Sequence, residues 1–326
     1  MSTHQRSFPV TSSLLSTGAL AALVERVYDV GTPTACVYWS RGPNDVYIVE
    51  AGARRYVLRV SRSGHRTRGE IRYELDLVKY LDRQGIPVAT PIEKRDRRLV
   101  HSLKAPEGVR HLVLFHYVTG AEEFHDLEDF VLFGHTVARA HNAMDDFSSP
   151  YSRPGHDLGD MVEETAEHLR SLLRHRQADE CYISKLVELL RNRKSEFLAE
   201  RLDVGVCHGD VHAGNCGIDD GIATMFDFDE CGSSWRAYDL ATFRWSAIGQ
   251  DDAIWHAFLR GYRSSRPLVK ADLCAVPVLV VLRQLWYMAE IAKNADLLGG
   301  RYVSDAFLDT NLRFLRRWIK KEKCLS

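Results

Sequence analysis

The chain has 326 residues, of which 45% are hydrophobic and 27% are charged, and its formal net charge is −1. A globular chain of this length buries a large core and is long enough for two domains. A net charge so near zero gives no bulk attraction to nucleic acid or to an anionic membrane, so neither partner is expected.

Seven cysteines are scattered along the chain, and none of them forms a C-x-x-C pair. Residues 1–16 contain no apolar run of the kind found in secretory signals. The longest apolar stretch, Ala275–Leu282, is too short to cross a bilayer. Together these features predict a cytoplasmic protein with free thiols.

The first third of the chain predicts a small sheet with two helices. A helix is expected over residues 17–30, with Ser16 or Thr17 as its N-cap, and a second over residues 67–84. Apolar runs bounded by glycine-containing turns predict strands over residues 34–39, 46–50, 56–60 and 111–118.

After Gly120 the periodicity becomes helical. An exception is the segment 204–229, which predicts a loop and two short strands around a turn at Asp219-Asp220-Gly221. The sequence therefore predicts an α+β protein with a β-rich N-terminal lobe over residues 1–117 and a helical C-terminal lobe over residues 118–326. Helices are expected over residues 127–144, 158–176, 183–200, 238–248, 255–262, 268–294 and 305–320.

The segment His208-Gly209-Asp210-Val211-His212-Ala213-Gly214-Asn215 contains an acid and an amide that are five residues apart. In protein kinases the catalytic Asp and a metal-binding Asn have this spacing. Phosphoryl transfer needs a residue that orients the attacking hydroxyl and accepts its proton, and oxygen ligands for Mg²⁺. We therefore assign Asp210 as the candidate catalytic residue and Asn215 as a candidate metal ligand.

Two further carboxylates follow the motif. Asp227 lies twelve residues after Asn215, at the end of the apolar run 223–226, where a rigid strand would hold a metal ligand. Asp229 is two residues further on, so a continuing strand would point it in the same direction as Asp227. Asp227 is expected to bind Mg²⁺ and Asp229 to be a second ligand, although a solvated turn acid is an equal alternative for Asp229.

A zinc site is the competing interpretation of this segment. Cys207, His208, His212 and Cys216 form a C-H-x3-H-x3-C cluster. The two histidines would share a face only on a helix, and the flanking glycines oppose a helix. Zinc is therefore the weaker hypothesis.

Arg59 is a charged residue in the apolar run Tyr56-Val57-Leu58-Arg59-Val60, and Glu74 on the next predicted helix is its candidate partner. In kinases a strand cation paired with a helix Glu grips the nucleotide phosphates, and the planar fork of arginine suits phosphate. The loop 40–45 holds a single glycine and no Walker A motif occurs, so a P-loop enzyme is excluded. Asp239 is expected to act structurally, as a first-turn acid or as a brace for the Asp210 loop.

Taken together, these motifs resemble the aminoglycoside phosphotransferase/choline kinase superfamily, which has a protein-kinase-like fold. His208-Gly209-Asp210-x-His212-x-x-Asn215 is similar to its catalytic loop, and Phe226-Asp227-Phe228-Asp229 to its metal-binding segment. Tyr238-Asp239-Leu240-Ala241 resembles the brace that follows, and the segments around Asn44, Arg59 and Glu74 resemble landmarks of the small lobe. The chain departs from the family at Trp235-Arg236, where many members have Asp-Pro.

The resemblance implies ATP and Mg²⁺ as cofactors, a nucleotide site that includes Asn44, and adenine near Phe115, His116 and Tyr117. The arginine at position 59 and the E-L-D-L helix look similar to the branch of type II homoserine kinases and bacterial stress-response kinases.

The sequence thus predicts an ATP- and Mg²⁺-dependent kinase that phosphorylates a hydroxyl group of a small molecule, such as an aminoglycoside or other antibiotic, homoserine or an amino alcohol. The alternatives are a protein Ser/Thr kinase on the same fold and a non-catalytic, nucleotide-binding pseudokinase. Acids and aromatics of the last hundred residues are candidates for reading an amine-bearing acceptor. They are Asp251, Asp252, Trp286, Tyr287, Glu290, Asp296 and Tyr302.

Overall fold

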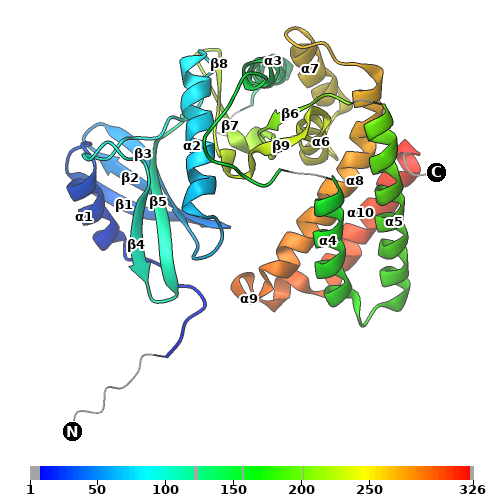
Figure 1. Cartoon of the computed structure of the whole chain (residues 1–326), viewed down its shortest axis with the longest axis horizontal. Coiled ribbons are helices and arrows are strands. Elements are labelled where there is room, and N and C mark those ends of the chain that lie inside the picture. The colour runs from blue at the N-terminus through cyan, green and yellow to red at the C-terminus, as the bar shows by residue number, and fades with distance from the viewer. Residues whose placement is uncertain (1–7, 121–123, 156–157, 201, 324–326) are drawn as a thin grey trace. The chain divides into compact units, whose positions relative to one another are not determined.

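The computed structural model describes residues 8–120, 124–155, 158–200 and 202–323 (Figure 1). Contacts divide the chain into two compact units. The N-terminal unit comprises residues 1–119 and 148–153, and the C-terminal unit comprises residues 120–147 and 154–326.

The N-terminal unit is built on a five-stranded antiparallel sheet with the order β1-β2-β3-β5-β4. The tight turns at Gly42 and Gly52 join the first three strands in sequence order, and Gly52 has a positive φ of 60°. The strands are β1 Pro33–Arg41, β2 Asn44–Ala51, β3 Arg54–Ser61, β4 His101–Ala105 and β5 Gly108–His116.

One helix covers each face of this sheet (Figure 1). Helix α1, Thr17–Val27, begins at the N-cap Ser16 and packs Leu20 and Val24 against the face that carries Leu112 and Leu114. Helix α2, Arg68–Arg83, begins with a capping box of Thr67 and Glu70 and packs against the opposite face, which carries Val113 and Phe115. Side chains that alternate along β5 therefore support both helices.

Ser148–Arg153 returns to the N-terminal unit after helix α3, Leu127–Met144, of the other unit, and this return was not predicted from the sequence. Its side chains attach to α2: Ser149 Oγ donates to Asp76 Oδ2 at 2.7 Å, and Arg72 Nη1 donates to the Tyr151 hydroxyl at 2.9 Å. The unit is therefore assembled from two separate parts of the chain.

The C-terminal unit is mainly helical, and helix α8 lies at its centre in contact with α4, α6 and α10. Helix α8 is long and apolar enough to cross a membrane by length and composition alone. Two thirds (67%) of its 18-residue apolar window is buried inside the unit, as is usual for a core helix. The helices are α3 Leu127–Met144, α4 Leu158–Leu173, α5 Gln177–Ala199, α6 Arg236–Ser246, α7 Asp252–Arg263, α8 Lys270–Lys293, α9 Ala295–Leu298 and α10 Asp305–Glu322.

Two short antiparallel pairs interrupt the helices. Strand β6, Val204–Cys207, pairs with β9, Gly232–Trp235, and β7, Cys216–Asp219, pairs with β8, Ile222–Met225. The catalytic-motif residues lie in the connections that leave these strands, together with the 3-10 turns η1, Ala213–Asn215, and η2, Phe228–Glu230. A third 3-10 turn, η3, spans Gly300–Val303.

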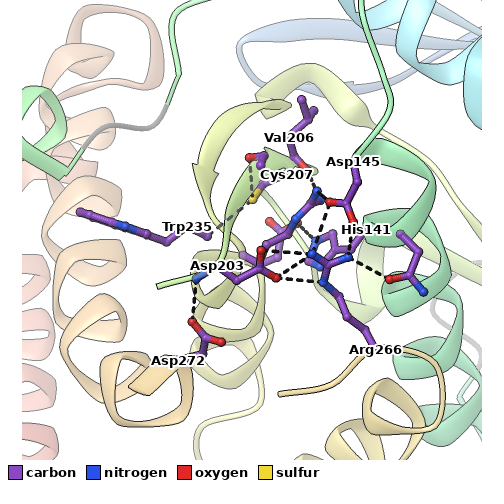
Figure 2. Close-up of polar contacts among 12 residues, drawn as sticks. His141, Asp145, Asp203, Val206, Cys207, Trp235, Arg266 and Asp272 are labelled. Atoms are coloured by element: carbon purple, nitrogen blue, oxygen red, sulfur yellow. Dashed lines mark hydrogen bonds and ion pairs between the residues drawn. The ribbon is translucent and has the colours of Figure 1, made fainter. Parts of the chain in front are cut away.

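A charged network fixes the entry to β6 (Figure 2). Arg266, which follows α7, donates to Asp203 at 2.9 Å and to Asp145 at 2.7 Å. Arg236, the first residue of α6, donates to the same Asp145 at 2.5 Å and also to the carbonyl oxygen of Val206. Two arginines thus share one carboxylate and hold the strand that leads into the motif loop.

Arg236 explains the departure from Asp-Pro that the sequence shows at Trp235-Arg236. Arg236 is only 1% exposed, and a Cβ at Gly205 would lie 2.3 Å from its guanidinium. The glycine therefore leaves the space into which the arginine side chain fits. The arginine then bonds directly to the β6 backbone beside the motif loop.

Strands β4, β6 and β9 and helix α9 were not predicted from the sequence. Strand β4 is an edge strand with alternating half-buried and exposed residues, and its polar composition concealed it. Helix α9 is a single turn. The strand expected to reach residue 118 ends at His116, and the short strand expected after the turn at 219–221 ends at Met225.

Helices α3 and α7 approach so closely that their contact depends on two glycines. A Cβ at Gly134 would lie 2.0 Å from the carbonyl oxygen of Phe258, and one at Gly261 would lie 1.9 Å from that of Val131. Both obstacles are backbone atoms, which cannot move aside as a side chain can.

We therefore expect Gly134→Ala to lower the free energy of unfolding by about 1–3 kcal/mol, because the helices must separate to admit the methyl group. Chemical denaturation measures this loss. The control is Gly300→Ala, since no atom lies within 4 Å of a Cβ there and its φ is not positive. Equal stability of the two variants would show that the helix contact tolerates the extra atom.

Candidate active site

The motif loop begins where β6 ends, at Cys207. Gly209 has a φ of 83°, a conformation that glycine adopts at little cost. The loop then runs through Asp210 and ends in the turn η1 with Asn215, whose backbone N–H donates to the carbonyl oxygen of His212 at 2.9 Å. The glycine thus allows a sharp change of direction immediately before the candidate catalytic acid.

Side-chain oxygens on helix α6 accept hydrogen bonds from three backbone N–H groups of this loop. Asp239 Oδ2 accepts the N–H of His208 and Asp239 Oδ1 that of Gly209, each at 2.8 Å. The Thr242 hydroxyl oxygen, one turn further along α6, accepts the N–H of Val211 at 3.1 Å. The structure therefore assigns Asp239 the bracing role that was one of its two predicted roles.

Asp239 is fully buried and is also paired with His141 of α3, whose Nε2 lies 2.9 Å from Asp239 Oδ2. The other ring nitrogen of His141 is 2.7 Å from the Tyr262 hydroxyl of α7. Burial lowers the pKa of His141 below its ordinary value, and the neutral ring donates to Asp239. Although burial opposes ionisation of Asp239, His141 and the loop N–H groups hold its pKa below the usual range.

His208 joins the motif loop to the Asp227 segment. Its Nδ1 accepts the backbone N–H of Asp210 at 3.2 Å, and its Nε2 donates to the carbonyl oxygen of Phe226 at 3.0 Å. Its ring centroid lies 4.4 Å from that of Phe228. These bonds fix the Nε2–H tautomer and hold the two acid-bearing segments together.

The two carboxylate oxygens of Asp210 have different partners. Oδ1 accepts a hydrogen bond from the guanidinium of Arg283 on α8. Oδ2 lies 3.3 Å from Asn215 Nδ2 and 3.4 Å from His212 Nε2. The Asp210 side chain is 23% exposed and the Arg283 side chain 6%, so the pair sits at the edge of the buried interior.

Burial alone would raise the pKa of Asp210, but the charge of Arg283 and the hydrogen bond from His212 outweigh it and hold the pKa well below its usual range. Asp210 is therefore an ionised acceptor at neutral pH. Such a carboxylate orients a hydroxyl and takes its proton late, as a loose phosphoryl-transfer transition state requires.

Asn215 connects the acid to the second segment. It is 7% exposed, and its Nδ2 donates to both the backbone oxygen of Asp210 at 2.9 Å and the side chain of Asp210. Its backbone oxygen accepts the N–H of Phe226 at 3.0 Å. Because the amide nitrogen faces Asp210, the amide oxygen points away and is oriented to bind a cation.

The strand that was expected to carry both Asp227 and Asp229 does not continue to them, so the two acids do not share a strand face. The strand ends at Met225, and Asp227 adopts a left-handed conformation with φ 59°. Asp229 then lies in the turn η2 and is 5% exposed, whereas Asp227 is exposed. A non-glycine residue in this conformation is uncommon and clusters at functional sites.

In the N-terminal unit, Arg59 and Glu74 form the predicted pair. Arg59 Nη2 lies 2.6 Å from Glu74 Oε2, and the two residues are 6% and 1% exposed. Arg153, on the returning segment, lies 3.9 Å from the same oxygen. Sequence reasoning missed Arg153 because it is separated from Glu74 by 79 positions and belongs to no recognised motif.

The other residues expected to bind nucleotide also lie in this unit. Asn44 begins β2 opposite Ser61 and is 8% exposed. Phe115 packs in the core beside α2, with Arg59 5.1 Å from its ring centroid. His116 ends β5 and is exposed, and the guanidinium of Arg55 lies 4.1 Å from the ring centroid of Tyr117.

The four residues of the zinc hypothesis have separate partners. Cys207 donates to the carbonyl oxygens of Gly205 and Trp235, and Cys216 to that of Gly217. Burial raises the pKa of both thiols, which keeps them protonated, whereas zinc binds thiolate. The six cysteines within the described residues form no disulfide with one another, and Cys324 lies outside the described residues.

Several residues proposed to read the acceptor have structural partners. Asp251 caps α7, and Asp252 pairs with Arg244 at 2.7 Å. Glu290 pairs with Lys293 at 3.3 Å. A cavity of about 520 Å³ is lined by Asp252 and by basic residues of α10, and none of its lining residues belongs to the motif loop.

Known proteins resemble the chain across both units. The family model described as "Phosphotransferase enzyme family" matches residues 38–270. An uncharacterized protein from Deinococcus radiodurans is 36% identical over 97% of this chain and 94% of its own length. Homoserine kinase from Neisseria meningitidis serogroup B is 25% identical over 77% of this chain and 80% of its own length.

Solved structures of small-molecule kinases have a similar fold. A microcompartment-associated aminopropanol kinase has a TM-score of 0.72 and 25% identity, with 95% of this chain and 99% of that chain covered. An amicoumacin kinase in complex with AMP-PNP, Ca²⁺ and Ami has a TM-score of 0.70 and 21% identity, with 94% and 93% covered. The predicted α+β, kinase-like fold is therefore confirmed.

The family model spans more than two thirds of the chain and includes the motif loop, its brace and the Arg59–Glu74 pair. The predicted family resemblance is thus confirmed: the chain belongs to the phosphotransferase enzyme family and is a phosphotransferase with kinases of small molecules as its relatives.

Proposed function

We propose that the protein transfers the γ-phosphoryl group of ATP to a hydroxyl group of a small molecule and requires Mg²⁺. The observation that carries this proposal is the geometry around Asp210. Arg283 donates a hydrogen bond to Oδ1 of the ionised Asp210 carboxylate. Asn215 Nδ2 donates to Oδ2 and to the backbone oxygen of Asp210. Such a group orients a nucleophile without itself needing to move.

In the proposed reaction the acceptor hydroxyl approaches Asp210 and its oxygen forms a bond to the γ-phosphorus. The bond between the γ-phosphorus and the β-γ bridging oxygen breaks, and ADP leaves with that electron pair. The hydroxyl proton passes to Asp210, which is ionised beforehand because Arg283 and His212 hold its pKa low.

Asn215, Asp227 and Asp229 supply the oxygen atoms that suit Mg²⁺, a hard cation. The amide oxygen of Asn215 points away from Asp210, and the bond from Phe226 N–H to the Asn215 carbonyl holds the Asp227 segment beside it. When bound, the ion neutralises charge on the phosphates. We assign Asn215 and Asp227 as its principal ligands, with Asp229 as the second carboxylate.

In the N-terminal unit, Arg59 is proposed to hold phosphate oxygens of ATP while Glu74 fixes its guanidinium. Asn44 is assigned to the nucleotide site with it, and the segment of Phe115, His116 and Tyr117 to the adenine. The strand position of Arg59 and its buried ion pair support this role, because a preordered arginine loses little freedom when phosphate binds.

For the acceptor we propose a compact compound that carries both a hydroxyl and an amine, such as an amino alcohol, homoserine or an amino-sugar antibiotic. The names of the related kinases, which include homoserine kinase and aminopropanol kinase, support this class. Glu290, on the same helix as Arg283, is a half-buried acid that could pair with an amine. A cytoplasmic location fits the free thiols and the need for ATP.

Two rival functions are separable by assay. A protein Ser/Thr kinase would phosphorylate a serine-containing peptide and leave hydroxyl compounds unchanged. A pseudokinase would bind ATP but release no ADP with any acceptor. Coupled ADP release across a panel of amino alcohols, hydroxy amino acids and aminoglycosides, with a serine peptide alongside, tests both.

We expect Asp210→Asn to lower kcat by about 10²- to 10⁴-fold, because the amide cannot accept the hydroxyl proton, while the affinity for ATP changes little. Coupled ADP release measures kcat, and a fluorescent nucleotide measures affinity. Asp220→Asn is the control, since Asp220 is exposed in the β7–β8 turn with φ 48°, which asparagine tolerates. If Asp210→Asn kept the turnover of the parent protein, Asp210 would not be the catalytic base.

Asp227→Asn is expected to raise the Mg²⁺ concentration for half-maximal activity by about 10- to 100-fold, because it removes a charged oxygen ligand. A Mg²⁺ titration of initial rates at constant free ATP measures the change, and Asp220→Asn again serves as control. An unchanged Mg²⁺ requirement would show that Asp227 is not a ligand.

A further inference from the structure

Arg283 is a buried arginine that the sequence motifs do not mark. It lies on α8, is 5% exposed, and its guanidinium donates to Oδ1 of Asp210, 73 residues earlier in the chain. Arg283 and Asp210 therefore form an ion pair. A buried charge is costly unless it is paired, so the two side chains depend on each other.

Two tryptophan side chains contact the guanidinium. Its Cζ lies 4.4 Å from the ring centroid of Trp286 and 5.3 Å from that of Trp245. Trp245 is itself fixed, because its indole N–H donates to Gln284 Oε1 at 2.8 Å. Gln284 in turn donates to Asn311 of α10 at 2.7 Å. Arg283 is therefore preordered by a rigid wall rather than by Asp210 alone.

The bond from Arg283 makes the two oxygens of Asp210 inequivalent. Oδ1 is engaged by a strong, charge-assisted donor. Among the residues that the structure describes, the recorded contacts of Oδ2 are longer, to Asn215 at 3.3 Å and His212 at 3.4 Å. A weakly engaged oxygen is the one that an incoming hydroxyl can reach.

We propose that Arg283 is a positioning residue, which holds Asp210 by Oδ1 so that Oδ2 receives the proton of the acceptor hydroxyl. This inference rests on the proposed kinase function. In the transfer step the O–H proton moves to Oδ2, the acceptor oxygen bonds to the γ-phosphorus, and ADP departs with the electrons of the broken P–O bond. Arg283 gains and loses no proton, because its guanidinium remains charged throughout.

The test is Arg283→Ala with chemical rescue. We expect kcat to fall about 100-fold, because small misplacements of a reacting group cost this much, while the KM values for ATP and for the acceptor change less than about threefold. Added guanidinium at millimolar concentration should refill the space beside the tryptophans and restore kcat at least about tenfold, whereas urea at equal concentration should not. The rescue distinguishes positioning by a cation from a purely structural role.

Arg260→Ala is the matched control, since Arg260 is an exposed arginine that pairs with Glu128. It should keep parent-like kcat with and without guanidinium. If Arg283→Ala keeps the parent kcat, or if only the acceptor KM rises, Arg283 does not position Asp210 and the proposal is overturned. Loss of kcat without rescue by guanidinium also overturns it.

Arg283→Lys carries the test if the alanine variant does not fold. Lysine keeps the charge but lacks the planar fork that fixes the carboxylate, so we expect kcat to fall roughly tenfold with unchanged ATP affinity. Parent-like kcat in this variant would contradict positioning by the fork. Failure of the proposed function is distinct, because the parent protein itself would then release no ADP with any acceptor.

Discussion

The site depends on one buried carboxylate, that of Asp239. Its two oxygens accept the N–H groups of His208 and Gly209 and the ring N–H of His141, without access to water. A loop with a positive-φ glycine has many alternative conformations, and these bonds select one of them. If the carboxylate were absent, the buried donors would lose their partners at a cost of about 1–3 kcal/mol each.

Hydrogen bonds connect the loop that Asp239 holds to the residues proposed to react. His208 connects the loop to the Phe226 carbonyl, and Asn215 connects Asp210 to the same segment. Arg283 then fixes the Asp210 carboxylate from a different helix. The proposed base and metal ligands are thereby held by a polar network within one unit, which is what phosphoryl transfer needs, since catalysis there is largely positioning and electrostatics.

The sequence predicted those features that depend on local patterns. Helix α3 has its predicted bounds, because its Asp126 cap and its periodicity are both local, and the order of the motif residues predicted the family. Features that depend on distant contacts were missed: the pairing of Arg283 with Asp210 joins residues 73 positions apart. The error over Asp229 came from a left-handed residue at Asp227, which no hydrophobic pattern encodes.

Native-state hydrogen exchange tests most directly whether Asp239 holds the loop. In Asp239→Asn one oxygen is replaced by an NH₂ group that faces N–H donors, so the amides of the peptide 206–211 should exchange at least about tenfold faster than in the parent protein. The peptide 312–318 of α10, which contains none of the hydrogen-bond partners recorded for Asp239 in the described part of the chain, should keep its rate. Unchanged exchange in the loop, or an equal acceleration in both peptides, would contradict the account.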